Sequence, residues 1–145
     1  MKGWRSWAVL VVVVTLILTG FVFFHRPAHH YNAAKYGRAW NAEKNFALAH
    51  TKVGGCLRPE GEHAQLLGVG KLRAICTELG DARKDELVTF LTKIDQKETG
   101  LAYMVGFKAI PDTCNFHLGG PWWQLAPLNV STMSCPRGFA FTGSG

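Results

Sequence analysis

The longest apolar run of the chain lies close to its N-terminus. The stretch 6–25 contains no charged residue and is flanked by Arg5 and Arg26. Its apolar core over 8–24 is interrupted only by two threonines and one glycine. Twenty helical residues reach about 30 Å, the thickness of the hydrocarbon core of a bilayer. The pattern predicts a transmembrane helix over 6–25 after a cytoplasmic tail over 1–5, with membrane-interface residues at its two ends: Trp4, Arg5, Trp7 and Arg26.

A cleaved signal peptide is the alternative interpretation of this apolar run. Signal peptidase sites need small residues at positions −3 and −1. The candidate sites in this chain place Leu18 or Arg26 at position −3. An uncleaved anchor is therefore the favoured prediction.

Helical spacing of apolar residues continues after the predicted anchor. It predicts a basic juxtamembrane helix over 26–52, which Gly54-Gly55 ends. The stretch 56–100 predicts two more helices, the second capped by Asp81. Their apolar stripes are Leu66, Val69, Leu72, Cys76 and Leu79 in the first, and Leu87, Phe90, Leu91 and Ile94 in the second.

The last stretch, 101–145, has the pattern of a small sheet. Apolar residues alternate with smaller or polar ones over 101–107, and short strand candidates follow at 122–125, 130–133 and 139–142. Four of the six prolines lie in this stretch. The predicted fold class is α+β: a transmembrane helix, a helical segment and a small antiparallel sheet, the last two forming one domain over 53–145.

Four cysteines indicate how this domain is held together. Their spacing is C-x19-C-x37-C-x20-C and includes no CxxC, which disfavours a zinc ribbon or a thioredoxin-type site. Buried reduced thiols are one interpretation; two disulfides are the favoured one, paired Cys56–Cys76 and Cys114–Cys135 because each then closes a loop within one half of the domain. Disulfides form in oxidising compartments, so the prediction is an inner-membrane, single-pass protein with a periplasmic C-terminal domain.

Composition and charge narrow the function classes. With 145 residues, 48% hydrophobic, the chain is neither a disordered polyelectrolyte nor a multi-domain enzyme. Residues 1–52 carry seven Lys or Arg and one acid, whereas 53–145 carry nine of each. A basic excess beside a membrane indicates contact with anionic lipid or an acidic partner, or only ordinary anchor flanks. No nucleic-acid motif accompanies it, so nucleic acid is not a predicted partner.

The stretch 101–145 is unusually poor in charge. Lys108, Asp112 and Arg137 are its only charged residues, while seven residues are aromatic. Charge depletion with aromatic enrichment is typical of the core of a protein interface. The alternative is that helices cover one face and neutral polar residues the other. We expect a protein partner, contacted through four aromatic residues: Trp122, Trp123, Phe139 and Phe141.

Candidate chemical sites are weak. His25, His29 and His30 cluster without an acidic or cysteine ligand, and Asp85-Glu86 reads as a solvated pair. The residue types of a hydrolase triad are present without a nucleophile elbow: Asp112, His117, Ser131 and Ser134. Asn129-Val130-Ser131 is a glycosylation sequon in a cell that glycosylates there. No cofactor, metal or small-molecule substrate is predicted, and an enzyme is not expected.

The order of an apolar helix, an amphipathic helix, a mixed region and a late cysteine pair resembles the layout of type IV pilins and pseudopilins. Met1-Lys2-Gly3 resembles a very short leader, and the resemblance implies a filament subunit cleaved after Gly3. That family has an apolar residue after the glycine and Glu at the fifth mature position. This chain has Trp4-Arg5 after the glycine, and its fifth position is Ala8.

The sequence thus favours a non-catalytic accessory or structural subunit of a cell-envelope complex. The predicted anchor would place it, and the charge-poor sheet would dock it. A pilin-like filament subunit and a small inhibitor or immunity protein are the alternatives. The filament subunit predicts processing after Gly3, and the inhibitor predicts a stable free monomer.

Overall fold

A computed structural model of the chain describes residues 3–24, 29–79, 85–93, 99–107, 110 and 113–141, with the side chains of 5, 21–24 and 79 excepted. Two α-helices and nine strands are present in these ranges. The helices are α1 (Gly3–Phe24) and α2 (Ala33–His50). The strands are β1 (Cys56–Leu57), β2 (Gln65–Leu66), β3 (Gly70–Lys71), β4 (Ala74–Leu79), β5 (Glu86–Lys93), β6 (Thr99–Val105), β7 (Cys114–Gly119), β8 (Trp122–Ala126) and β9 (Ala140–Phe141).

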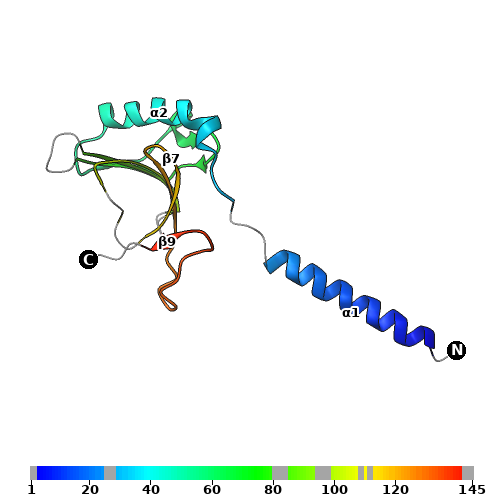
Figure 1. Ribbon diagram of the computed structural model, residues 1–145. Helices are drawn as coiled ribbons and strands as arrows, with labels where there is room; N and C mark the ends of the chain where they lie inside the picture. Colours follow the sequence, from blue (N-terminus) through cyan, green and yellow to red (C-terminus); the bar gives the residue numbers. More distant parts are fainter. Residues whose placement is uncertain are drawn as a thin grey trace.

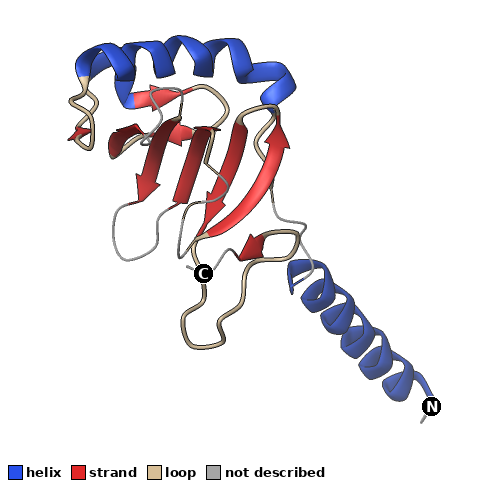
Figure 2. Cartoon of the chain, turned by 60° about the vertical axis from the view of Figure 1, so that its left-hand side comes forward, coloured by secondary structure: helices blue, strands red, loops and turns tan. Residues whose placement is uncertain are grey.

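Seven strands form one antiparallel sheet in the order β1-β4-β5-β6-β8-β7-β9. Strands β2 and β3 form a separate small pair, and the turn Gly61–Ala64 precedes it. Helix α2 lies across one face of the curved sheet, and α1 extends away from both (Figures 1 and 2). The two outer strands, β1 and β9, have two residues each, so each edge of the sheet is short.

Helix α2 begins and ends at clear local signals. The side chain of Asn32 accepts a hydrogen bond from the Lys35 backbone N–H at 3.0 Å, which satisfies one of the free donors of the first turn. The Thr51 N–H still donates to Ala47 O, and the extended Thr51 ends the helix. The helix predicted over 26–52 therefore starts at Ala33, and 26–28 lie outside the described residues.

The two helices predicted over 56–100 are wrong, because this stretch supplies the first strands of the sheet instead. Strand β5 explains the error: its residues 87–91 are buried without a break. Val88 and Phe90 pack on the α2 side, and Leu87 and Leu91 pack on the other. A strand covered on both faces loses the alternation of period two, so its sequence mimics a helical stripe. The predicted cap Asp81 and stripe residue Ile94 lie outside the described residues.

Strand predictions over 101–145 fared better. Strands β6, β8 and β9 match the expected positions closely. Residues 130–133 form a turn instead of a strand, and β7 is a strand that the pattern did not predict.

The core has two layers, one on each face of the sheet. On the α2 side, the fully buried Trp40 and Ala47 of the helix pack on Ile75, Val88, Phe90, Leu101 and Trp122. On the opposite side, Ile110 and the partly buried Phe107 pack on Leu87, Leu91, Ala102, Met104 and Leu125. Phe107 and Ile110 therefore cover this face of the sheet, as α2 covers the other.

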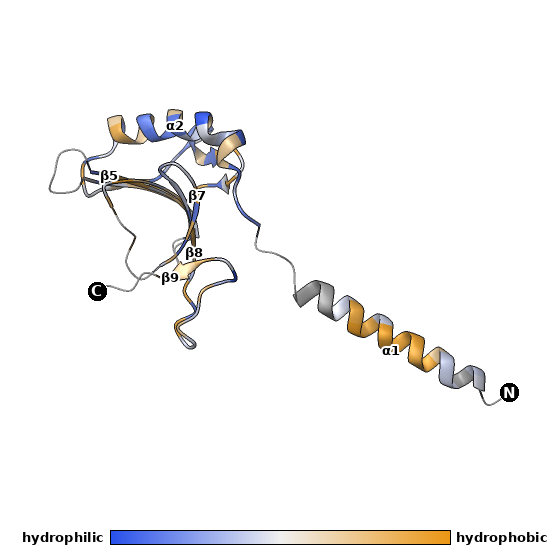
Figure 3. Ribbon diagram, viewed as in Figure 1, coloured by the Kyte–Doolittle hydropathy of each residue, from blue (hydrophilic) through white to orange (hydrophobic). Residues whose placement is uncertain are grey.

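The apolar run near the N-terminus forms a helix, and Figure 3 shows its strongly hydrophobic middle. A membrane span needs about 20 consecutive apolar residues. Side chains are described without a break only over 6–20 of α1. Among the described residues, no helix has both the length and the apolar character needed to cross a membrane. This finding overturns the predicted transmembrane helix over 6–25 and the predicted single-pass, inner-membrane localisation.

Candidate functional site

Two disulfides lie toward the two edges of the sheet: one joins β1 to β4, and the other joins β7 to the loop between β8 and β9. Cys56 pairs with Cys76, directly opposite each other on β1 and β4, and Cys114 of β7 pairs with Cys135. These are the pairings favoured from the sequence. Cys114 is fully buried, whereas Cys56 is exposed. Disulfides of this kind are compatible with an extracellular location.

The second disulfide holds the base of a loop that projects from the sheet between β8 and β9 (Figure 2). We call residues 129–134 at its end the tip. Asn129 and Ser134 exchange two backbone hydrogen bonds, of 3.0 and 3.3 Å, which close the tip. The Asn129 side chain accepts hydrogen bonds from the Ser131 N–H and hydroxyl, at 3.2 and 2.7 Å. The hydroxyls of Thr132 and Ser134 lie 2.6 Å apart and hydrogen-bond to each other.

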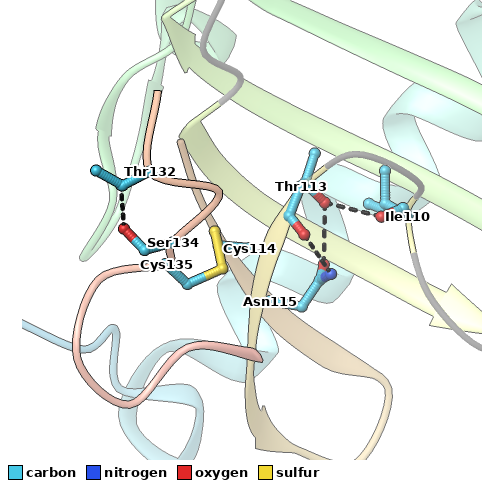
Figure 4. Close-up of a disulfide and its surroundings, with 7 residues drawn as sticks. All are labelled: Ile110, Thr113, Cys114, Asn115, Thr132, Ser134 and Cys135. Atoms are coloured by element: carbon cyan, nitrogen blue, oxygen red, sulfur yellow. Dashed lines mark hydrogen bonds between the residues drawn. A yellow bond between two sulfur atoms is a disulfide. The ribbon is translucent and has the colours of Figure 1, made fainter. Parts of the chain in front are cut away.

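A buried polar network holds the strand to which the loop is fixed (Figure 4). The Thr113 hydroxyl donates to Ile110 O at 2.9 Å, and the Asn115 amide donates to Thr113 O at 3.2 Å. Both residues are buried and flank Cys114. Because each polar group has a partner, the network adds order without an unsatisfied group. The loop therefore rests on a well-defined base.

The tip carries exposed apolar side chains inside this hydrogen-bonded frame. Val130 is 71% exposed and Met133 is 59% exposed. Met133 has a φ of 47°, a left-handed backbone conformation that is rare for residues other than glycine. Neither residue was predicted to bind a partner. A signal was present, since Leu128, Val130 and Met133 stand among turn-forming residues between two prolines.

The four aromatic residues predicted to dock a partner are in different environments. Trp122 is buried against α2, with its ring 5.3 Å from that of Trp40 and 5.2 Å from that of Tyr103. Trp123 lies on the other face, half-buried beside His117. Trp122 is thus a core residue and is not accessible to a partner.

Phe139 and Phe141 lie beside the projecting loop. Phe139 is half-buried, 5.7 Å from Phe116, and Phe141 in β9 is 37% exposed. The accessible apolar surface at this edge therefore consists of Phe141 and the two tip residues, rather than of the tryptophans.

Residues 29–32, which we call the strap, precede α2 and contact β7 and β8, the strands beside the projecting loop. The buried Gln124 side chain accepts from the Tyr31 N–H and donates to His29 O, both at 3.0 Å. The His30 ring stacks on Phe116 at 3.7 Å. Burial raises the pKa of the Tyr31 phenol above its ordinary value of 10.0. The strap is held by backbone and side chain alike.

The residues considered for catalysis do not come together among those described. His117 hydrogen-bonds to Gly120 O at 2.8 Å, and the hydroxyls of Ser131 and Ser134 are bonded within the tip. Asp112, His25 and Arg26 lie outside the described residues. In the part of the chain that the structure covers, no three potential ligands gather in a way that could hold a metal ion.

Comparison of the chain with family models, with curated proteins and with solved structures found no match. The arrangement of the described residues is therefore the basis for a proposal about function.

Proposed function

We propose that this protein is a non-catalytic subunit of a protein assembly and that it docks on its partner through the C-terminal loop, residues 127–141. The proposal rests chiefly on one observation: the tip exposes Val130 and Met133 on a loop fixed by the Cys114–Cys135 disulfide. Exposed apolar residues held in one conformation bind at a low cost in entropy, because little remains to be ordered.

The chemistry of the loop supports a protein partner. Arg137 is the only charged residue over 127–141. Methionine and aromatic residues are enriched in interface cores, and acidic residues are depleted there. Phe141 extends the apolar surface from the tip to the edge of the sheet. The expected partner therefore presents an uncharged, largely apolar surface.

The test is the native mass of the full chain with its co-purifying partners, in two double variants. Val130→Ser with Met133→Ser removes the apolar tip. Val53→Ser with Leu67→Ser removes two side chains that are each 63% exposed elsewhere on the domain. We expect the first variant to lose the larger assembly and the second to keep it, with both folded. A monomeric wild type, or equal behaviour of the two variants, would contradict the proposal.

A pilin-like filament subunit is the second candidate, favoured by a different observation. Helix α1 exposes large apolar side chains all around its axis, from 46% at Val14 to 85% at Trp4. It is followed by a helix across an antiparallel sheet and by a C-terminal segment closed by a disulfide. This order resembles the layout of type IV pilins and pseudopilins. Other copies of the chain would then cover α1.

Mass spectrometry of the N-terminus of the protein from its native source tests this candidate. A filament subunit of this type is expected to begin at Trp4, after cleavage behind Gly3. An intact Met1 in the assembled protein would rule it out. Loss of the assembly in the tip variant, with Met1 intact, would then favour docking on a different protein.

A further inference from the structure

We propose a second binding site at the opposite edge of the sheet, where Arg58 and Arg73 bind the acidic group of a small organic acid. Two hollows meet at these arginines, one of about 320 Å³ and one of about 450 Å³, and both arginines line both hollows. Hollows of this size are at the lower end of the range for small-molecule sites. This site lies apart from the C-terminal loop and does not depend on the function proposed for it.

The backbone beneath the two arginines is fixed. Arg58 follows β1, which is joined to β4 by the Cys56–Cys76 disulfide. The Arg73 N–H donates to Leu91 O at 2.7 Å. The neighbouring Pro59 and Leu72 are buried. A binding site is more effective when its side chains project from a rigid backbone, because less order has to be created on binding.

Neither arginine forms an ion pair in the described part of the chain. The ion pairs found there join only His63 to Glu43 and Glu62. Lys71 and Glu60 also line the hollow of about 320 Å³. Three cations against one carboxylate leave an excess of positive charge. Like charges held close together repel, and a bound anion relieves that repulsion.

The residue types at the site indicate which anion fits. A guanidinium group presents paired donors that match a carboxylate or a phosphate in two-point geometry. The hollow of about 450 Å³ is completed by Cys56, Leu57 and Ala74, a largely apolar lining. The ligand class is therefore an acid group on a short apolar chain: the acid at the arginines, and the chain over Leu57 and Ala74.

The test is a titration of the full chain, kept monodisperse in non-ionic detergent and followed by backbone NMR. The probes are inorganic phosphate and hexyl phosphate, with hexanoate as the carboxylate counterpart. We expect saturable shifts at 56–58 and 71–74, and at least tenfold tighter binding of hexyl phosphate than of phosphate, which burial of two or more methylenes supplies.

Matched variants separate this site from general attraction to a basic protein. Arg58→Gln with Arg73→Gln is expected to weaken hexyl phosphate binding at least tenfold. Arg38→Gln with Arg137→Gln removes the same charge from two exposed positions elsewhere and is expected to change binding less than twofold. Both variants keep the fold, because all four arginines are exposed. The single variant Arg73→Gln measures the contribution of that arginine alone to hexyl phosphate binding.

Two outcomes would overturn the proposal. Shifts that do not saturate with any probe, or that are equal in the two double variants, would show that there is no specific site. Equal affinities for phosphate and hexyl phosphate would show an inorganic anion site without a place for the apolar chain. Tighter binding of hexanoate than of hexyl phosphate keeps the site and assigns a carboxylic acid to it.

Discussion

The two edges of the sheet are closed in the same way and present opposite chemistry. Each has an outer strand of only two residues, and at each a disulfide joins segments 20 or 21 residues apart. One edge displays Arg58 and Arg73 over two hollows, and the other displays a projecting loop whose only charged residue is Arg137. Short edge strands limit unwanted pairing with other sheets. Because the disulfides fix the adjoining loops, the side chains of these loops are available for binding.

The edges also differ in how firmly they are held. Near the arginines, Thr77 exchanges backbone hydrogen bonds with 54–55 and its hydroxyl donates to Lys52 O. At the loop edge, the strap, the polar network and a fully buried half of the disulfide all meet near β7. More interactions depend on the loop edge, so we expect it to contribute more to stability.

Removal of the second disulfide should have the largest effect. For Cys114→Ala with Cys135→Ala, we expect the free energy of unfolding to fall by about 3 kcal/mol from chain entropy, and further because Cys114 is buried. The Cys56–Cys76 disulfide closes a loop of similar length, but Cys56 is exposed, so Cys56→Ala with Cys76→Ala should lower the free energy of unfolding by less. Urea unfolding of both variants gives the comparison, and an equal or reversed order would contradict it.

Loss of the Gln124 side chain should come next. Gln124→Leu removes two hydrogen bonds to the strap and leaves the Tyr31 N–H and His29 O without these partners. We expect a loss of about 2 kcal/mol and faster hydrogen exchange at the Tyr31 amide. Gln65→Leu, at an exposed position of β2, is the matched control. Unchanged exchange at Tyr31 would mean that the strap is held without Gln124.

The two disulfides should also differ in their rates of reduction, which is a smaller effect than the two losses of stability. Cys56 is exposed and Cys114 is buried, so a thiol reductant reaches the first bond more easily. We expect Cys56–Cys76 to be reduced several-fold faster under native conditions, which alkylation and mass spectrometry can follow. Faster reduction of Cys114–Cys135 would show that the loop edge opens more readily than its contacts imply.

Part of this architecture could be predicted from the sequence. The disulfide pairing followed from spacing, and β6 and β8 followed from alternation and turn residues. Strand β5 could not be predicted, because residues buried on both faces carry no signal of period two. Adjacent residues of a strand, such as Trp122 and Trp123, point to opposite faces of the sheet. The packing of Trp40 decides which of the two is buried.

The candidate sites depended on contacts that no local pattern encodes. The tip was predicted to be a strand over 130–133. Its exposed turn follows from the disulfide at its base and from the Asn129–Ser134 pairing. Arg58 and Arg73 are 15 positions apart and meet only because β1 pairs with β4. The apolar run of α1 was read as a membrane span from hydropathy alone, and the described helix does not meet the requirements for one.

The smallest predicted effect concerns Tyr31 in the strap and appears only at high pH. Burial raises the pKa of its phenol above 10.0, so the folded state holds this proton more tightly than the unfolded state does. The corresponding stability is present below pH 10 and is lost as the pH rises through the folded pKa. We therefore expect Tyr31→Phe to have a smaller difference in unfolding free energy between pH 8 and pH 11 than the wild type has. If Tyr31→Phe and the wild type lose stability equally over this range, ionisation of Tyr31 does not contribute, and the strap is packed less tightly against the loop edge than its hydrogen bonds to Gln124 indicate.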